Sequence, residues 1–403
     1  MNEFNKIGIH NHLIESLQSL SIYKPTLIQK EAIPFILNGK DIIAQAQTGT
    51  GKTLAFVLPI VQKIDVSKDY VQALIVAPTR ELAIQLTEEI NKVTKSIENL
   101  HVLAIYGGQD VEQQLKRLNK VNQLIVATPG RLLDHVRRGT IDLSKTEMLV
   151  LDEADQMLHM GFLPEVETIL FTLPKQKQMM LFSATMPPAI RALSKKYMNN
   201  PEEVTIKYQN ITVEKINQLV IETTDRGKLD SLCQLINEYR PFLAILFCRT
   251  KRRAKSLNAA LQSRGYLSDE LHGDLSQAKR ERVIKKFRDA KIQLLVATDV
   301  AARGLDIEGI THVFNYDIPH DVESYIHRIG RTGRAGFEGI AITLVAKKDM
   351  QHLQLIENGI QRSLPKKIHI KHNGKGSEKE DLKSNKKNQL HRRNHNKKYD
   401  KRR

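Results

Sequence analysis

Cysteine is scarce in this 403-residue chain, and its scarcity narrows the class of protein. The two cysteines, Cys233 and Cys248, stand fifteen positions apart in apolar surroundings and form no C-x-x-C pair. This pattern argues against a disulfide framework and against a cysteine-based metal site. We expect two buried free thiols in a reducing cytoplasm.

Long hydrophobic runs are also absent. The first residues, MNEFNKIGIHNHL, contain no apolar signal region, and no later run approaches the roughly 20 apolar residues that span a bilayer. We therefore expect a soluble, cytoplasmic protein without a membrane partner.

Acidic residues are outnumbered, and the formal net charge of +17 is unevenly distributed. Residues 366–403 contain fifteen Lys or Arg against four acidic residues, a net charge of +11 that leaves about +6 for the rest of the chain. Because this segment has few apolar residues, it is predicted to be a disordered basic tail. Its charge favours a polyanionic partner, and nucleic acid rather than a membrane because it lacks an apolar face.

Short runs rich in Val, Ile and Leu recur, each followed by Gly, Pro or Thr and then by a helical pattern. A first series reads DIIAQAQTG, VQALIVAPT, HVLAIYGG, NQLIVATPG, MLVLDEAD and MMLFSAT, and a second reads INQLVIETT, FLAILFC, LSDELHG, IQLLVAT, HVFNYDI and GIAITLVA. Apolar strands that alternate with helices predict an α/β fold in which helices flank a parallel sheet. We expect two such domains, residues 1–208 and 216–365, joined by a polar linker at 206–215 and followed by the tail at 366–403.

A phosphate-binding loop is predicted at residues 46–53, AQTGTGKT, between a strand and a helix. The stretch matches G-x-x-x-x-G-K-[ST] except for Ala46 at the first glycine. Glycine allows backbone N–H groups to surround phosphate oxygens, Lys52 adds a positive charge, and Thr53 offers a hydroxyl to Mg²⁺. The alternative is a flexible turn with a surface lysine. The predicted nucleotide-binding set is Ala46, Gln47, Thr48, Gly49, Thr50, Gly51, Lys52 and Thr53.

Three acids end the run MLVLDEADQM at residues 148–157. A helix cap would explain Asp152 or Asp155, but not Glu153 between them. Since a phosphate loop needs an acid on a neighbouring strand to hold Mg²⁺, we assign Asp152 to the metal and Glu153 to the attacking water.

These stretches, together with some dozen motifs in order between residue 4 and about residue 345, resemble the DEAD-box ATP-dependent RNA helicases of superfamily 2. The resemblance implies two tandem RecA-like domains, ATP and Mg²⁺ as cofactors, and RNA as partner. It also implies local separation of RNA duplexes or remodelling of RNA–protein complexes, driven by RNA-stimulated ATP hydrolysis.

The resemblance assigns SIYKPTLIQ, residues 21–29, to adenine recognition, with Gln29 reading the base and Phe4 upstream. A side-chain amide can both donate to and accept from adenine. Ser21 and Ile22 replace the usual glycine and aromatic residue, so Ile22 or the shifted Tyr23 remain alternatives for the contact with the base.

The resemblance also implies RNA contacts. In the first domain they are Pro78, Thr79 and Arg80 of PTREL, Gly107 and Gly108 of YGG, and Thr128 and Arg131 of TPGR, for each of which an ordinary turn with a surface arginine is the alternative. In the second they are Arg249 and Thr250 of FCRT, Gln277 and Arg280 of Q-x-x-R, and Thr298 of ATD.

Further residues are implied to join the two domains. Asp306 is expected to meet the ribose, and Arg331 and Arg334 of HRIGRTGRAG to act as arginine fingers on the γ-phosphate. The resemblance also implies a set of residues that couples nucleotide state to strand separation: Asp155, Ser183, Thr185 and His327. For the hydroxyls of Ser183 and Thr185, the alternative is that they cap a helix.

The resulting hypothesis is that ATP and RNA both favour a closed arrangement of the domains and are reciprocally coupled. The tail is expected to add nonspecific RNA affinity, or else to be dispensable. Two other functions stay open: an ATP-gated RNA clamp or assembly scaffold with little unwinding, and a DNA translocase. By analogy with bacterial members of the family, ribosome assembly, RNA decay or cold adaptation is the expected cellular setting.

Overall fold

A computed structural model describes residues 2–46, 49–108, 122–206, 216–302, 307, 309–333 and 338–368. Several predicted positions lie outside these residues: Gln47, Thr48, Asp306, Arg334 and the tail from residue 369 onward. None of the helices within the described ranges is long and apolar enough to cross a membrane.

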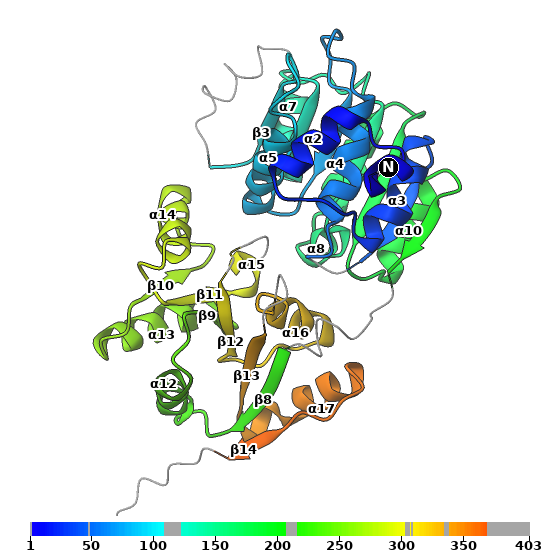
Figure 1. The fold of residues 1–403 in the computed structure, drawn as a ribbon. Helices are drawn as coiled ribbons and strands as arrows, with labels where there is room; N and C mark the ends of the chain where they lie inside the picture. Colours follow the sequence, from blue (N-terminus) through cyan, green and yellow to red (C-terminus); the bar gives the residue numbers. More distant parts are fainter. Residues whose placement is uncertain are drawn as a thin grey trace, which may run out of the picture.

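Two seven-stranded parallel sheets form the protein, and they share one topology (Figure 1). The first has the order β3-β4-β2-β5-β6-β1-β7 and the second β10-β11-β9-β12-β13-β8-β14, which is the same order when each sheet is counted from its own first strand. The predicted class, two tandem α/β domains with parallel sheets, is confirmed.

The bounds of the elements follow. The first sheet contains β1 (Ile42–Gln45), β2 (Ala73–Val76), β3 (Val102–Ile105), β4 (Leu124–Ala127), β5 (Met148–Leu151), β6 (Gln178–Ser183) and β7 (Glu202–Thr205). The second contains β8 (Ile216–Glu222), β9 (Leu243–Cys248), β10 (Ser268–Leu271), β11 (Leu294–Thr298), β12 (Ile310–Asn315), β13 (Gly339–Val345) and β14 (Lys366–Ile368).

Helices cover both faces of each sheet. Those of the first domain are α1 (Glu3–Lys6), α2 (Asn11–Ser19), α3 (Leu27–Leu37), α4 (Lys52–Lys63), α5 (Arg80–Val93), α7 (Pro129–Arg137), α8 (Ala154–His159), α9 (Leu163–Thr172) and α10 (Pro188–Tyr197). Those of the second are α12 (Lys228–Tyr239), α13 (Lys251–Ser263), α14 (Gln277–Arg288), α15 (Asp299–Ala302), α16 (Val322–Ile329), the 3₁₀ turn η1 (Lys347–Asp349) and α17 (Met350–Gly359).

Strand residues alternate between two apolar layers, which explains the continuous hydrophobic runs. In β2, Ala73 and Ile75 join one cluster while Leu74 and Val76 join the other. In β9 the same alternation divides its residues between the two cores of the second sheet. Because both faces are buried, each strand carries apolar side chains on both.

The strands β7 and β14 were missing from the prediction, and β14 corrects a boundary. Residues 366–368 pair with β8, so the second sheet extends three residues beyond the predicted end at residue 365. Both strands are polar edge strands beside the first strand of their sheet, with the sequences EEVT and KKI. They lack the double-sided apolar pattern that identified the others.

In both domains the helix after the first strand begins at a Gly-Lys pair, although Gly51 has a left-handed φ of 91° and Gly227 a φ of −82°. In the first domain, Gly51 precedes α4, which starts at Lys52. In the second, Gly227 precedes α12, which starts at Lys228, but the Lys228 ammonium forms a buried ion pair with Asp349, Nζ to Oδ2 2.9 Å. The cation that could meet a phosphate is therefore already neutralised in the second domain.

His312, on β12, makes the stability of the second domain pH-dependent. It is 6% exposed, and its Nε2 has no hydrogen-bond partner among the described residues. Burial lowers the pKa of His312 to about 4. The unfolded chain takes up this proton below a pKa of about 6.5 while the folded chain does not, so folding stability is lost as pH falls from about 6.5 toward 4.

We predict that this residue costs up to about 2 kcal/mol of unfolding free energy at pH 5 relative to pH 7. His312→Phe keeps a ring beside Tyr239 and Phe314 but cannot titrate. Urea unfolding at the two pH values should show a smaller pH response in this variant than in the parent chain. An equal response in both would contradict the assignment.

Candidate functional site

The loop between β1 and α4, of which Ala46 and residues 49–51 are described, contains glycines in left-handed conformation and is followed by a buried lysine. Gly49 and Gly51 adopt left-handed backbone angles, φ 81° and 91°, which glycine reaches without strain. Lys52, 7% exposed, donates from Nζ to the Ala46 carbonyl oxygen at 2.8 Å. The lysine ammonium is thus held across the loop.

Gln29 joins this loop to α3. Its Oε1 accepts from the Thr26 N–H at 3.0 Å and its Nε2 donates to the Gly51 carbonyl oxygen at 2.9 Å. The Gln29 side-chain amide keeps one N–H and one oxygen lone pair that these two bonds do not use. It could therefore still contact adenine, and that contact stays a prediction. A structural role beside it was not anticipated.

A cavity of about 460 Å³ opens beside the loop. It is lined by Leu20, Ile22, Gly49, Gly51, Lys52, Thr53, Leu54, Leu82, Gln85, Glu89, Lys92, Val93, Asp152, Glu153 and Arg331. Ile22 lies in this wall, whereas Tyr23 is 61% exposed and is not among the lining residues. Of the two alternatives for the apolar contact, the geometry favours Ile22. Ser21, with φ 61°, adopts the conformation that a glycine would take without strain.

The acids after β5 are buried. Asp152 Oδ1 accepts from the Glu153 N–H at 3.0 Å, and Glu153 has a left-handed φ of 51°. This uncommon conformation for a residue with a side chain turns the chain sharply between the two carboxylates. Burial raises the pKa of Asp152 to about 7, the nearby Lys52 ammonium opposes that rise, and the Glu153 charge adds to it.

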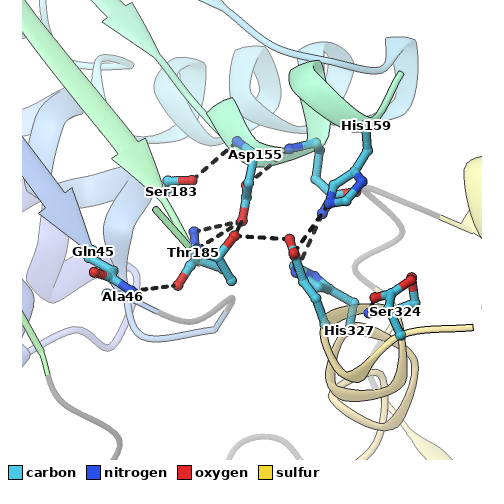
Figure 2. A network of polar contacts seen from close by, with 12 residues as sticks. Gln45, Ala46, Asp155, His159, Ser183, Thr185, Ser324 and His327 are labelled. Carbon is cyan, nitrogen blue, oxygen red and sulfur yellow. Dashed lines mark hydrogen bonds and ion pairs between the residues drawn. The ribbon is translucent and has the colours of Figure 1, made fainter. Parts of the chain in front are cut away.

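Asp155 connects the acidic stretch to the end of β6 (Figure 2). Its Oδ2 accepts from the backbone N–H groups of Ala184 and Thr185 at 3.1 and 2.9 Å, and lies 3.1 Å from Thr185 Oγ1. The Asp155 N–H donates to Ser183 Oγ at 3.1 Å. The alternative of helix capping thus holds for Ser183, which lies at the end of β6 and caps the start of α8. The same β6 end accepts, at the Ser183 carbonyl oxygen, a hydrogen bond from the Ala46 N–H at 3.0 Å.

Glu323 of α16 carries this network into the second domain, and it was not among the residues predicted from the sequence. Thr185 Oγ1 lies 3.0 Å from Glu323 Oε1, and His159 Nε2 lies 3.2 Å from Glu323 Oε2. His327, one helical turn further along α16, lies 3.7 Å from Oε1. Burial raises the pKa of Glu323, but hydrogen bonds from His327 and His159 outweigh it and lower the pKa to about 2. Its spacing of four residues from His327 was the available signal.

The Thr185 hydroxyl has one hydrogen and two carboxylate neighbours, Asp155 and Glu323. It can donate to only one of them at a time. Asp155 belongs to the first domain and Glu323 to the second, so the orientation of this hydroxyl distinguishes a bond within the first domain from a bond between the domains.

A second cavity, of about 430 Å³, gathers most of the predicted first-domain RNA set. Its lining includes Pro78, Thr79, Arg80, Gly107, Thr128 and Arg131 from the first domain and Arg280 from the second. Arg280 forms an ion pair with Glu81, Nη2 to Oε1 2.7 Å, and Arg80 Nη1 donates to Gln277 Oε1 at 3.4 Å. We name this cavity the basic groove.

Other predicted RNA residues lie elsewhere or have structural partners. Arg249, Thr250 and Thr298 are not among the described residues that line the basic groove, and neither is Gly108. The hydroxyls of Thr79 and Thr250 cap α5 and α13, accepting backbone N–H groups at 3.2 and 3.3 Å. Their assignment to RNA stays a prediction.

Arg331 reaches the first domain. It is 6% exposed and lines the loop cavity together with Lys52, Asp152 and Glu153. By contrast, Arg328 is 3% exposed and forms a bidentate ion pair with Asp299 of its own domain. Its Nε donates to Oδ1 at 2.5 Å and its Nη2 donates to Oδ2 at 2.7 Å. The two arginines of one motif thus divide into a structural residue and a residue of the site.

Comparisons with known proteins agree with this geometry. The DEAD/DEAH box helicase family model matches residues 26–193, and the helicase conserved C-terminal domain model matches residues 227–336. The ATP-dependent RNA helicase CshA of Listeria monocytogenes is 50% identical over 364 residues, 90% of this chain and 70% of that protein. The DEAD-box ATP-dependent RNA helicase CshA of Geobacillus kaustophilus is 50% identical, covering 90% and 78%.

Solved structures agree as well. S. cerevisiae Dbp5 bound to RNA and ADP BeF3 has a TM-score of 0.84 at 34% identity, covering 91% of this chain and 96% of that one. Mss116p bound to ssRNA and AMP-PNP has a TM-score of 0.82 at 29% identity, covering 91% and 78%.

The two loop glycines provide a matched test of the Gln29 contact. A Cβ on Gly51 would lie 2.6 Å from Gln29 Nε2 and 2.9 Å from Thr26 Oγ1, whereas a Cβ on Gly49 would meet nothing within 4 Å. Left-handed backbone costs both alanine variants about 1 kcal/mol. We predict that Gly51→Ala also breaks the contact by which Gln29 and Thr26 cap the start of α3. This loss should lower the free energy of unfolding by about 1 kcal/mol more, as measured by urea unfolding. Equal destabilisation of Gly49→Ala and Gly51→Ala would contradict this role of Gln29.

Proposed function

The chain belongs to the DEAD-box family of ATP-dependent RNA helicases, and from this premise we propose how its residues divide the work. The observation that carries the proposal is that Arg331 of the second domain lines one cavity with Lys52, Asp152 and Glu153 of the first. A site completed by both domains links turnover to their closure.

In the first domain, the glycine N–H groups and Lys52 bind the phosphates of ATP, and Gln29 orients the base above an apolar wall that includes Ile22. Thr53 and Asp152 are oxygen donors on one cavity, the ligand chemistry that Mg²⁺ prefers. When bound there, Mg²⁺ would neutralise phosphate charge. Burial raises the pKa of Asp152 to about 7, so part of this carboxyl is protonated at neutral pH and would release its proton on binding the cation.

Glu153 is the residue that orients and deprotonates the attacking water, and Arg331 stabilises the charge on the γ-phosphate. Arg334 and Asp306 complete the second-domain side in this proposal. Asp155, Ser183, Thr185 and His327 carry the state of the nucleotide to the second domain, and Glu323 joins them as a positioning residue.

RNA occupies the basic groove in this proposal, held through its sugar–phosphate backbone. Arg80, Arg131 and Arg280 are the cations that meet phosphates. The ion pair of Arg280 with Glu81 must then exchange for a phosphate contact, which makes binding dependent on salt. Contacts to the backbone predict little sequence preference.

We further propose a cytoplasmic location, with structured RNA of ribosome assembly or RNA decay as the target. The two free and buried thiols, Cys233 and Cys248, fit a reducing compartment. The basic segment predicted as a tail, residues 366–403, adds nonspecific affinity for RNA and keeps the domains near it. This role falls to the residues after β14, because Lys366–Ile368 form that strand.

Glu153→Gln tests the assignment of the water-activating residue. The variant should keep ATP binding but lose at least about a hundredfold of RNA-stimulated ATP turnover, because general-base catalysis contributes on that order. Separation of a short RNA duplex should fall with it. The measurement compares turnover without nucleic acid, with RNA and with DNA, for parent and variant.

Stimulation by DNA equal to that by RNA would contradict the RNA assignment. Unwinding that survives Glu153→Gln would contradict coupling to hydrolysis, and turnover of the parent chain without strand separation would favour the RNA clamp.

A further inference from the structure

Two histidines from different domains lie beside one carboxylate. His159 belongs to α8 of the first domain and His327 to α16 of the second, and Figure 2 shows them approaching from opposite sides. His159 Nε2 lies 3.2 Å from Glu323 Oε2, and His327 Nε2 lies 3.7 Å from Glu323 Oε1. Asp155 is the fourth member, because it, Glu323 and His327 place donor atoms within 4.8 Å of one another. We name these four residues the α8–α16 cluster.

The cluster borders a small cavity. This cavity has a volume of about 20 Å³, and its lining includes Gln156, His159, Glu323 and His327. A single water molecule needs a cavity of about 10–15 Å³. The space is therefore too small for a nucleotide and large enough for one ion.

One buried polar atom in the wall of this cavity lacks a partner. Gln156 is 2% exposed, and its Oε1 has no hydrogen-bond partner among the residues that the structure describes. Its Nε2 lies 3.4 Å from His327 Nε2, so the amide lies beside the cluster. In this orientation Gln156 donates and His327 Nε2 accepts, which leaves on Nε2 the lone pair that a metal ion requires. A buried amide oxygen without a donor costs free energy, and a cation would satisfy it.

The charges around the cavity favour a cation. Arg328 and Arg331 also line it, but the guanidinium of Arg328 is paired with Asp299. Burial raises the pKa of Glu323, but hydrogen bonds from the histidines of the cluster lower it to about 2, so this carboxylate is ionised. Together with Asp155 it provides two carboxylates against the one remaining arginine, Arg331.

The donor atoms select the class of metal. Imidazole nitrogens together with a carboxylate oxygen suit Zn²⁺ and its first-row neighbours, whereas Mg²⁺ prefers oxygen ligands. In a tetrahedral zinc site with bonds of about 2.0–2.2 Å, neighbouring donor atoms lie roughly 3.4 Å apart. The two separations between imidazole and carboxylate in the cluster, 3.2 and 3.7 Å, lie on either side of that value.

We propose that the α8–α16 cluster binds one Zn²⁺, or a similar divalent transition metal ion, that links the two domains. Its ligands are the Nε2 atoms of His159 and His327 and one oxygen of Glu323, with Gln156 Oε1 or a water in the fourth position. Asp155, which accepts backbone N–H groups at the end of β6, contributes negative charge.

The ion has a consequence for turnover that goes beyond the proposed function. Because each domain supplies a ligand, the bound ion stabilises their closed arrangement. Reopening, on which the release of products depends, is then slower. Zinc is thus an inhibitor of turnover that strengthens the binding of ATP and RNA, since all three ligands favour one arrangement of the domains.

The test uses His159→Gln in the full-length chain. Glutamine keeps a hydrogen-bond donor for Glu323 but lacks the imidazole nitrogen. The matched control is His352→Gln, which removes a histidine that also lies beside another, His320, with ring centroids 4.7 Å apart. All three chains keep the histidines of the C-terminal segment, so zinc bound there is common to them: His369, His372, His391 and His395.

Metal binding is measured with excess Mg²⁺ present, by competition with a chromophoric chelator for Zn²⁺ and by the visible absorption of Co²⁺. The parent chain should bind one Zn²⁺ that His159→Gln binds at least about tenfold more weakly, since even partners outside the ligand set change metal affinity by about 10- to 100-fold. The Co²⁺ absorption of this site should be lost in His159→Gln and kept in His352→Gln. Zinc binding by the parent should tighten when a non-hydrolysable ATP analogue and single-stranded RNA are both present.

Turnover is then measured with RNA at one buffered concentration of free Zn²⁺, and each chain is compared with its own turnover without zinc. Zinc should reduce the turnover of the parent and of His352→Gln, and a chelator should restore it. His159→Gln should lose less of its turnover at the same concentration.

Equal zinc affinity in the parent and His159→Gln, or an equal loss of affinity in His352→Gln, would overturn the site. Zinc binding that neither slows turnover nor tightens with the analogue and RNA would overturn the link between the domains. Failure of the proposed function has a different signature: the metal-free parent would lack RNA-stimulated turnover, while the difference in zinc affinity between the parent and His159→Gln would stand.

Discussion

The hydroxyl of Thr185 lies between two carboxylates that belong to different domains, and in the proposed mechanism communication between the domains depends on it. It is 3.1 Å from Asp155 Oδ2 and 3.0 Å from Glu323 Oε1 (Figure 2). Apart from the hydroxyl, Asp155 Oδ2 accepts from two backbone N–H groups, and the Glu323 carboxylate lies beside two histidines. In the proposed mechanism, the two orientations of the hydroxyl act as the switch between the domains.

On each side, this contact is connected through the chain to residues that line the loop cavity. On the first-domain side, Asp155 follows Glu153 by two residues, and the Ala46 N–H binds the Ser183 carbonyl oxygen, so loop, acids and β6 form one connected group. On the second-domain side, α16 carries Glu323 and leads directly to Arg331. A change at the nucleotide can thus reach the arginine that completes the site. The second domain repeats the fold, but its equivalent lysine, Lys228, is buried and paired with Asp349 of its own domain.

Patterns of apolar residues predicted the fold class and twelve of the strands, because strands buried on both faces leave an unambiguous signature. The edge strands β7 and β14 were missed because their polar side chains carry no such signature. Motif spacing pointed to the Lys52 loop and the acids, and the family resemblance pointed to Arg331; the structure brings these residues to one cavity, and their roles stay predictions. Glu323, the Gln29 contact with Gly51, and the partners of Arg280 were out of reach, because each depends on how distant segments meet in space.

The most direct test is a double-mutant cycle on Thr185→Val and Glu323→Gln. The quantity to measure is the factor by which a non-hydrolysable ATP analogue strengthens binding of single-stranded RNA. If one shared hydrogen bond carries the coupling, each single variant reduces this factor and the double variant reduces it no further than the stronger single one. If the two losses simply add, the residues act independently, and the Thr185 hydroxyl is not the link between the domains.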